Sequence, residues 1–113
     1  MMKVAIPTDD GLIVRQHFRG SRAFIVATVK EGMIVHQDLR WNLLSEILTS
    51  EHGSFYNLVD CDILIVNEIG NCQREILKTI EKEIIHTDQT EISKAFVDFM
   101  ESVYILNEVE QTA

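Results

Sequence analysis

The chain contains few of the residues that build several common kinds of site. Its 113 residues include only two cysteines and one proline, and 10 basic residues stand against 18 acidic ones. Two cysteines that form no Cys-x-x-Cys pair exclude a disulfide framework, and they exclude a zinc knuckle or four-cysteine iron–sulfur site within one chain. A net charge of −8 argues against general nucleic-acid binding, which needs a broad basic face.

Long apolar runs are missing as well. No stretch approaches the roughly 18 continuous apolar residues of a membrane span, and the first residues lack the apolar core of a secretory signal. We therefore expect a cytoplasmic protein that does not enter a membrane. The length suits one domain with a single core, and the hydrophobic fraction of 46% is ordinary for such a domain.

What is present is a pattern of short apolar segments that predicts an α/β fold. Strand–helix–strand units require parallel pairing with right-handed crossovers, whereas a short turn joins antiparallel strands. The element order therefore predicts a mixed five-stranded sheet with an N-terminal antiparallel hairpin and helices on both faces. The predicted strands are 3–7, 23–29, 33–39, 63–66 and 83–87, and the predicted helices are 54–60, 71–82 and the one opened by 88–91.

Two of these strands carry specific expectations about burial. The run 63–66 is apolar throughout, which is typical of a parallel strand covered on both faces. The segment 33–39 alternates instead, and we expect Met33, Val35 and Leu39 to lie on its core-facing side.

The helix starts and the end of the chain are also predicted. Asn71 is expected to cap the helix that it opens, and Asp88, with Glu91, is expected to form a capping box for the last helix. Residues 1–103 are predicted to form the domain, and residues 104–113 an acidic tail.

The loop after the first strand is unusually basic for this chain. His17 is accompanied by Arg15, Arg19 and Arg22, so three of the ten basic residues fall within eight positions. Imidazole is a common ligand of transition metals, and arginines attract anions. The loop therefore predicts a site for an anionic, metal-containing ligand.

Folding should bring further ligands to this loop. Functional groups of open α/β sheets gather beyond the carboxyl ends of the parallel strands, which is expected to bring His17, His52 and Cys72 to one rim. Cys72 lies in the first turn of a predicted helix, where the backbone N–H groups favour a thiolate and bind anions. Thiolate and imidazole suit iron, zinc or a metal–sulfur cluster.

At these residues the sequence resembles the dinitrogenase iron–molybdenum cofactor biosynthesis family, over roughly residues 2–101. The family includes small cofactor carriers and the C-terminal domain of the cofactor-assembly radical enzyme. Its pattern has a His-Phe-Gly-Arg-like loop and a Gly-Ile-Gly after an apolar strand, where this chain has His-Phe-Arg-Gly and Glu-Ile-Gly. The segments that carry the resemblance are Ala5–Gly11, His17–Gly20, His52–Gly53 and Ile63–Gly70.

The resemblance implies a ribonuclease-H-like, three-layer α/β/α fold. It also implies non-catalytic binding or carriage of an iron–sulfur or iron–molybdenum type cofactor, or its precursor, in contact with cluster-assembly proteins. The metal ligands we expect are His17, His52 and Cys72. The cofactor-binding residues we expect are His17, Arg15, Arg19, Arg22, His52 and Asn71.

Two other functions remain open at this stage. One is an interaction or regulatory module of the same fold that has lost the metal site. The other is a divalent-metal phosphoesterase using Asp9, Asp10 and Glu68. A homodimer that shares one ligand is a further hypothesis about assembly, because one chain supplies few soft ligands.

Overall fold

The protein is described from a computed structural model that covers residues 1–42 and 57–112, and residues 104–112 as backbone only. Residues 54–56 of the predicted helix at 54–60 and the predicted ligand His52 lie outside these described residues, and residues 57–60 form a turn and not an α-helix. The elements are β1 (Met2–Thr8), β2 (Ala23–Lys30), β3 (Met33–Trp41), β4 (Ile63–Val66), α2 (Asn71–Thr79), β5 (Glu83–His86) and α3 (Ile92–Thr112).

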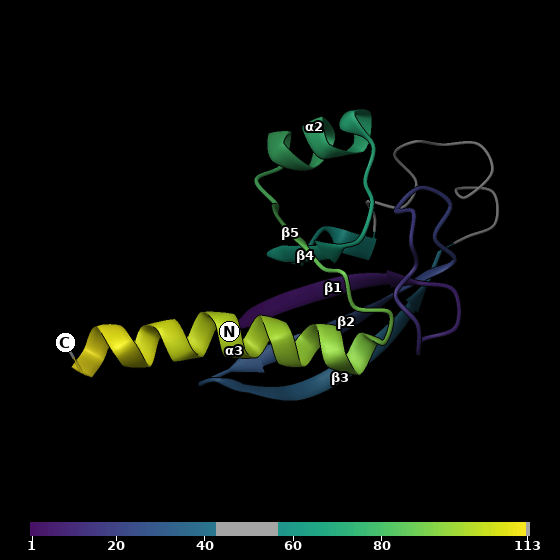
Figure 1. The fold of residues 1–113 in the computed structure, drawn as a ribbon. Coiled ribbons are helices and arrows are strands. Elements are labelled where there is room, and N and C mark those ends of the chain that lie inside the picture. The colour runs from purple at the N-terminus through teal and green to yellow at the C-terminus, as the bar shows by residue number, and fades with distance from the viewer. Residues whose placement is uncertain (43–56, 113) are drawn as a thin grey trace.

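The five strands form one mixed sheet in the order β3-β2-β1-β4-β5 (Figure 1). β1 pairs antiparallel with β2 and parallel with β4, so the N-terminal strand lies at the centre. β2 and β3 form the antiparallel hairpin, and β5 adds to β4 in parallel. The predicted α/β fold class, with its hairpin and its parallel β-α-β unit, is confirmed.

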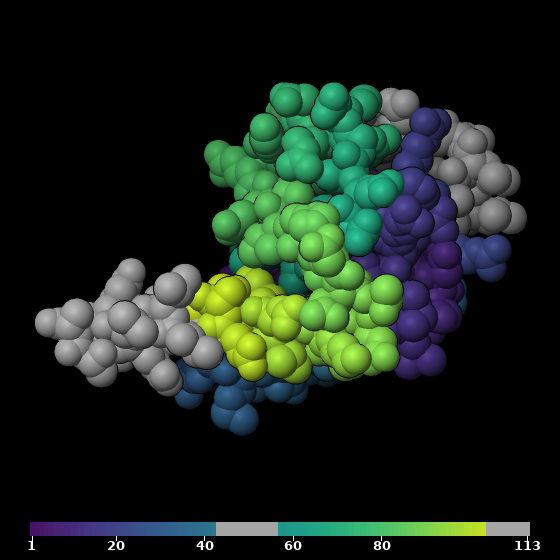
Figure 2. Space-filling model, in the orientation of Figure 1, coloured from purple at the N-terminus to yellow at the C-terminus, as the bar shows by residue number. Residues whose placement is uncertain are grey.

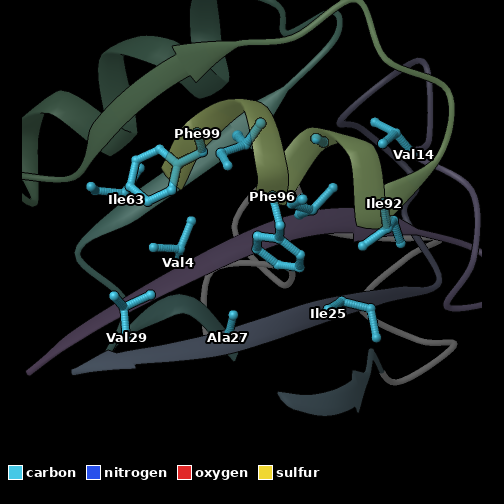
Figure 3. Packing of buried hydrophobic residues seen from close by; sticks show 12 residues of the cluster. Val4, Val14, Ile25, Ala27, Val29, Ile63, Ile92, Phe96 and Phe99 are labelled. Carbon is cyan, nitrogen blue, oxygen red and sulfur yellow. The ribbon is translucent and has the colours of Figure 1, made fainter. Parts of the chain in front are cut away.

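One face of the sheet packs against α3. Side chains from alternate positions of β1, β2 and β4 point to this face, as Val4, Ile25 and Ile63 do, and Phe96 and Phe99 of α3 cover them (Figure 3). Both phenylalanines are 3% exposed. Burying an aromatic or aliphatic side chain of this size stabilises the fold by about 1.5–3 kcal/mol.

The opposite face of the sheet packs against α2. The remaining positions of the same strands, among them Phe24 and Leu64, form a second buried cluster with Leu77 of α2. Because β4 alternates between the two clusters, its four residues are all buried, as its apolar sequence predicts. The molecule therefore has three layers, with the sheet between α2 and α3.

The expected burial of β3 is wrong at its first half. Leu39 packs against the α3-side core, but Met33 and Val35 are 67% and 56% exposed. The register with β2 shifts next to Val35, and Ile34 packs on the core instead. A bulge of this kind changes which residues face inward, because side chains alternate with a period of two.

The predicted helix caps are also wrong. Gly70, not Asn71, is the N-cap of α2, and no side chain caps it. α3 begins at Ile92, four residues after Asp88, whose carboxylate pairs with His86 instead. The segment 88–91 is used to connect β5 to the helix, so its acidic residues are not in the first turn.

α3 is the longest element, and its C-terminal end extends beyond the sheet (Figure 1). The helix includes the backbone of residues 104–112, so this part of the predicted tail continues α3. The molecule measures 50 × 28 × 24 Å. Within the described part of the chain, no helix combines the length and the apolar character that crossing a membrane requires.

Candidate functional site

The loop after β1 is shaped by a tight turn at Asp10. One oxygen of the Asp10 carboxylate accepts hydrogen bonds from the N–H groups of Leu12, at 2.9 Å, and Ile13, at 3.0 Å. The bond from Ile13, followed by that from Leu12, lowers the pKa of Asp10 below its ordinary value. The Thr8 hydroxyl accepts from the N–H of Gly11 and donates to the carbonyl of Ile13. This turn sends the chain back toward the sheet.

The returning segment lies against the end of β4. The N–H of Glu68 donates to the carbonyl of Gln16 at 2.8 Å, and the N–H of Phe18 donates to the carbonyl of Glu68 at 2.9 Å. His17 lies between these two bonds, in a parallel bridge with Glu68. The Phe18 ring is buried, 5.9 Å from the ring of Phe24. The loop is therefore anchored on both sides of His17.

Arg15 holds the loop from within. Its guanidinium donates to the carbonyl of His17 at 2.8 Å and to that of Arg19 at 3.3 Å, and it pairs with the carboxylate of Asp9 at 2.6 Å. Gly20 has φ +82°, and a Cβ there would lie 3.2 Å from the guanidinium. The inverted Arg-Gly order thus places glycine at the position that needs a positive φ.

These contacts form one wall of an open pocket of about 640 Å³. The other wall is the connection from β4 into α2, and the atoms of the two segments adjoin in the space-filling view (Figure 2). The loop after β1 and the start of α2 therefore meet at the carboxyl rim, as expected. The lining residues are Arg15, His17, Phe18, Arg19, Glu68, Ile69, Gly70, Asn71, Cys72 and Gln73.

Two of the predicted site residues are not found among this lining. Arg22 is exposed, and its backbone N–H donates to the carboxylate of Asp9 at 3.2 Å. His52 lies outside the described residues. Over residues 1–42 and 57–103, no group of three or more His, Cys, Asp or Glu side chains is arranged to hold a metal ion. The pocket thus offers fewer protein ligands than a closed metal site needs.

His17 is paired through one ring nitrogen. Its Nδ1 lies 2.9 Å from one oxygen of Glu68, and the other oxygen accepts from the side-chain amide of Gln16 at 3.2 Å. The side chains of His17 and Glu68 are 65% and 53% exposed. No hydrogen bond or ion pair to Nε2 of His17 is found within the described part of the chain. That nitrogen remains available to a ligand.

The chain's two cysteines differ in their surroundings. Cys72 is exposed at the start of α2, a helix whose first turn holds no acidic residue. Cys61 is buried, and burial, reinforced by the charge of Asp60, raises the pKa of its thiol to about 11. Cys61 therefore stays a protonated core thiol at neutral pH, as its position before a buried strand suggests.

The sequence suggested Glu68 only for the phosphoesterase hypothesis and did not suggest Gln16, so neither was expected beside His17 in a cofactor site. They are found only when the loop is laid along the end of β4, which joins residues 52 positions apart in the chain. The one available indication was the carboxylate of Glu68 in place of the first glycine of Gly-Ile-Gly.

The fold and the pocket define a class of protein: a small three-layer α/β domain with a charged, open pocket at the carboxyl rim of its sheet. Residues 1–102 match the dinitrogenase iron-molybdenum cofactor family. The chain belongs to that family, which confirms the resemblance seen at the motifs. No curated protein matches the chain.

Solved structures share the fold at low sequence identity. A candidate dinitrogenase from Methanocaldococcus jannaschii has a TM-score of 0.72 at 18% identity, covering 89% of each chain. A candidate NifB protein from Thermotoga has a TM-score of 0.71 at 22% identity, again with 89% of each chain covered. The apo form of the orange protein from Desulfovibrio gigas has a TM-score of 0.70 at 18% identity, covering 90% of this chain and 89% of its own.

Proposed function

We propose that this protein binds and carries an iron–sulfur or iron–molybdenum type cluster, or its precursor, without catalysing a reaction on it. The cluster is cargo that the protein receives from, and returns to, cluster-assembly proteins. Family membership supports a cofactor-related role. The chemistry of the pocket lining supports the proposed ligands.

The observation that carries the proposal is the meeting of His17 and Cys72 at one open pocket. Imidazole nitrogen and thiolate sulfur are the ligands that iron and metal–sulfur clusters prefer. The start of α2 adds backbone N–H groups that favour anions, and Arg19 adds a positive charge on the same lining. An anionic cluster therefore meets ligands of the right chemistry and charge of the right sign.

The number of ligands favours a transient cargo over a resident cofactor. Two soft protein ligands leave most positions on a cluster to be filled by its own sulfides, by thiols or by a second chain. A pocket that is open to solvent also allows the cluster to enter and leave. Asn71, next to Cys72 on the lining, and the predicted His52 are candidates for further contacts.

One observation favours the alternative function of an interaction module without a metal site. Among the described residues no three His, Cys, Asp or Glu side chains converge to hold a metal ion. The phosphoesterase hypothesis has less support, because the three carboxylates that it needs have separate tasks. Asp9 pairs with Arg15, Asp10 closes its turn, and Glu68 pairs with His17.

Anaerobic reconstitution with iron and sulfide separates these functions. We expect the wild type to take up iron with the absorption of a bound cluster, and His17→Ala to retain less than about a tenth of it. Cys72→Ser should lose most of the bound iron as well, because a hydroxyl is a poor ligand for it. His36→Ala is the matched control, since His36 is exposed on β3, outside the pocket.

Two results would contradict the proposal. If the wild type and His17→Ala bind equally little iron, the protein is an interaction module and not a carrier. If a magnesium- or manganese-dependent hydrolysis appears that Asp9→Asn abolishes, the phosphoesterase reading replaces both.

A further inference from the structure

We propose that the start of α2 binds a doubly negative tetrahedral oxyanion, such as sulfate, and that the side-chain amide of Gln73 is one of the groups that hold it. The site opens on the same pocket as His17 but uses none of the expected metal ligands. It therefore does not depend on whether the pocket carries a cluster, and it goes beyond the carrier function.

Gln73 is a buried polar residue without a protein partner. It lines the pocket, yet the residue is only 6% exposed. Among the described residues no hydrogen bond to its side-chain amide is found. Since no fully enclosed polar side-chain atom lacks a partner in this part of the chain, the nitrogen and the oxygen of the amide must both reach the pocket solvent. Water or a ligand must therefore complete the hydrogen bonds of this amide.

The chain makes room for the amide at Gly70. A Cβ at position 70 would lie 2.5 Å from Oε1 of Gln73, which is closer than real Cβ atoms approach. The φ of Gly70 is −71°, which any residue adopts, so glycine is needed here for space and not for backbone freedom. The amide oxygen thus lies against the backbone at the helix start, and the amide nitrogen remains a hydrogen-bond donor.

The backbone at the start of α2 adds further donors. The first bond within the helix runs from the N–H of Arg74 to the carbonyl of Gly70 at 3.0 Å, so the N–H groups before it have no partner in the helix. For the N–H groups of Asn71 and Gln73, no hydrogen bond is found within the described part of the chain. No side chain caps the helix, and its first turn holds no acidic residue. N–H groups in this position bind sulfate and phosphate.

The charges on the pocket lining suit an anion. Arg19 is exposed on the opposite wall, and its guanidinium makes no hydrogen bond or ion pair among the described residues. Of the lining residues only Glu68 is acidic, and its carboxylate lies 2.9 Å from Nδ1 of His17. Backbone, amide and guanidinium donors thus border one open space, and an oxyanion supplies the acceptor oxygens that they need.

A titration of the metal-free protein with sodium sulfate tests the site. In ¹⁵N spectra at pH 7, with sodium chloride at matched ionic strength as the reference, we expect saturable shifts of the backbone N–H groups of Asn71 and Gln73 and of the Gln73 side-chain amide. Gln73→Met keeps the length of the side chain but removes its donor, and should weaken sulfate binding about 10-fold. Gln37→Met is the matched control, because Gln37 is exposed on β3, outside the pocket lining.

Gly70→Ala is an independent test, because it removes no hydrogen-bonding group. Its methyl group would displace the amide of Gln73, so it should weaken sulfate binding by a factor similar to that of Gln73→Met. Arg19→Gln should weaken binding less, by about threefold, because a charge that is exposed to solvent contributes little.

Two results would overturn the proposal. One is a wild type whose N–H signals respond to sulfate no more than to chloride. The other is wild-type affinity for sulfate in Gln73→Met or, if that variant does not fold, in Gly70→Ala. Neither result bears on the carrier function, which the uptake of iron decides separately.

Discussion

Two histidine–carboxylate pairs lie at the same rim of the sheet, and they differ in whether the second ring nitrogen of the histidine has a partner. His17 contacts Glu68 through Nδ1 at 2.9 Å. His86 contacts the carbonyl of Asn67 through Nδ1 at 3.0 Å and the carboxylate of Asp88 through Nε2 at 2.8 Å. Both nitrogens of His86 are thus used by the fold, whereas one nitrogen of His17 is left for a ligand.

The two cysteines differ in exposure. Cys61 is buried in the core on the α2 side of the sheet, and Cys72 is exposed on the pocket lining. What distinguishes a candidate site residue here is therefore not the residue type but its place: His17 and Cys72 line the pocket, whereas His86 and Cys61 do not.

The largest expected difference is in thiol reactivity. At pH 8 we expect iodoacetamide to label Cys72 about 100-fold faster than Cys61, because the thiolate is the reactive form and a pKa of about 11 leaves Cys61 protonated. Mass spectrometry of peptides from a time course measures both rates. Equal rates would show that the two thiols are not separated by burial.

The second difference is in the iron bound by two variants, His17→Ala and His86→Ala. His17→Ala should lose at least about 10-fold in bound iron after reconstitution, whereas His86→Ala should bind as the wild type does. Metal analysis of the desalted proteins gives both values. Loss of iron in His86→Ala, with the fold intact, would mean that the β5 side of the rim belongs to the site.

The same two variants should rank in the opposite order when their free energies of unfolding are compared instead of their iron binding. His86→Ala removes contacts to Asn67 and Asp88 and should lower the free energy of unfolding by about 1 kcal/mol. His17→Ala removes one exposed pair and should stay within about 0.5 kcal/mol of the wild type. Urea unfolding followed by circular dichroism compares them. The reverse order would assign His17 to the fold and His86 to the site.

The smallest expected effect is on stability, where the carboxylates of Asp60 and Glu68 are compared. Asp60 pairs with Arg40, and also with Lys3 at 2.8 Å, and the hydrogen bonds from Arg40 hold the pKa of Asp60 well below its ordinary value. Because its folded pKa is lowered, its stabilisation is present above about pH 4 and is lost as the pH falls further. Asp60→Asn should cost about 0.5 kcal/mol at pH 7.

This loss should shrink as the pH falls below about 4, since the wild type then loses the same interaction. Glu68→Ala serves as the comparison and should have little effect on stability at pH 7, because its pair is exposed and belongs to the pocket. An Asp60→Asn protein as stable as the wild type at pH 7 would remove Asp60 from the residues that hold the fold.

Much of the fold could be predicted because its signals are local. The continuous apolar run of β4 requires two covered faces, and the helical period from Ile92 to Val103 requires one buried stripe. The bulge in β3 could not be predicted, because it depends on how β3 meets β2 and leaves no mark in the alternation itself. The prediction that Asp88 caps the last helix was wrong for a similar reason, because the partner of Asp88 is His86 and not a helix end.

The site, like the fold, could be predicted only in part. Because functional groups of open α/β sheets gather at the carboxyl ends of the parallel strands, the sequence predicts that the His17 loop and the start of α2 meet, although it gives no contact between them. The pairing of His17 with Glu68 was out of reach, because it follows from the loop lying in parallel against the end of β4. The task of Arg15, which holds three loop groups, likewise depends on the folded shape of the loop.

His17 retains an available ring nitrogen, whereas both ring nitrogens of His86 contact oxygen atoms of the fold. The most direct test is a ¹⁵N spectrum of the histidine side chains of the wild type, recorded before and after anaerobic loading with iron and sulfide. We predict that the Nε2 signal of His17 shifts or broadens beyond detection while both nitrogens of His86 stay unchanged. An unperturbed His17 in the loaded protein, or an equal perturbation of His86, would contradict the claim.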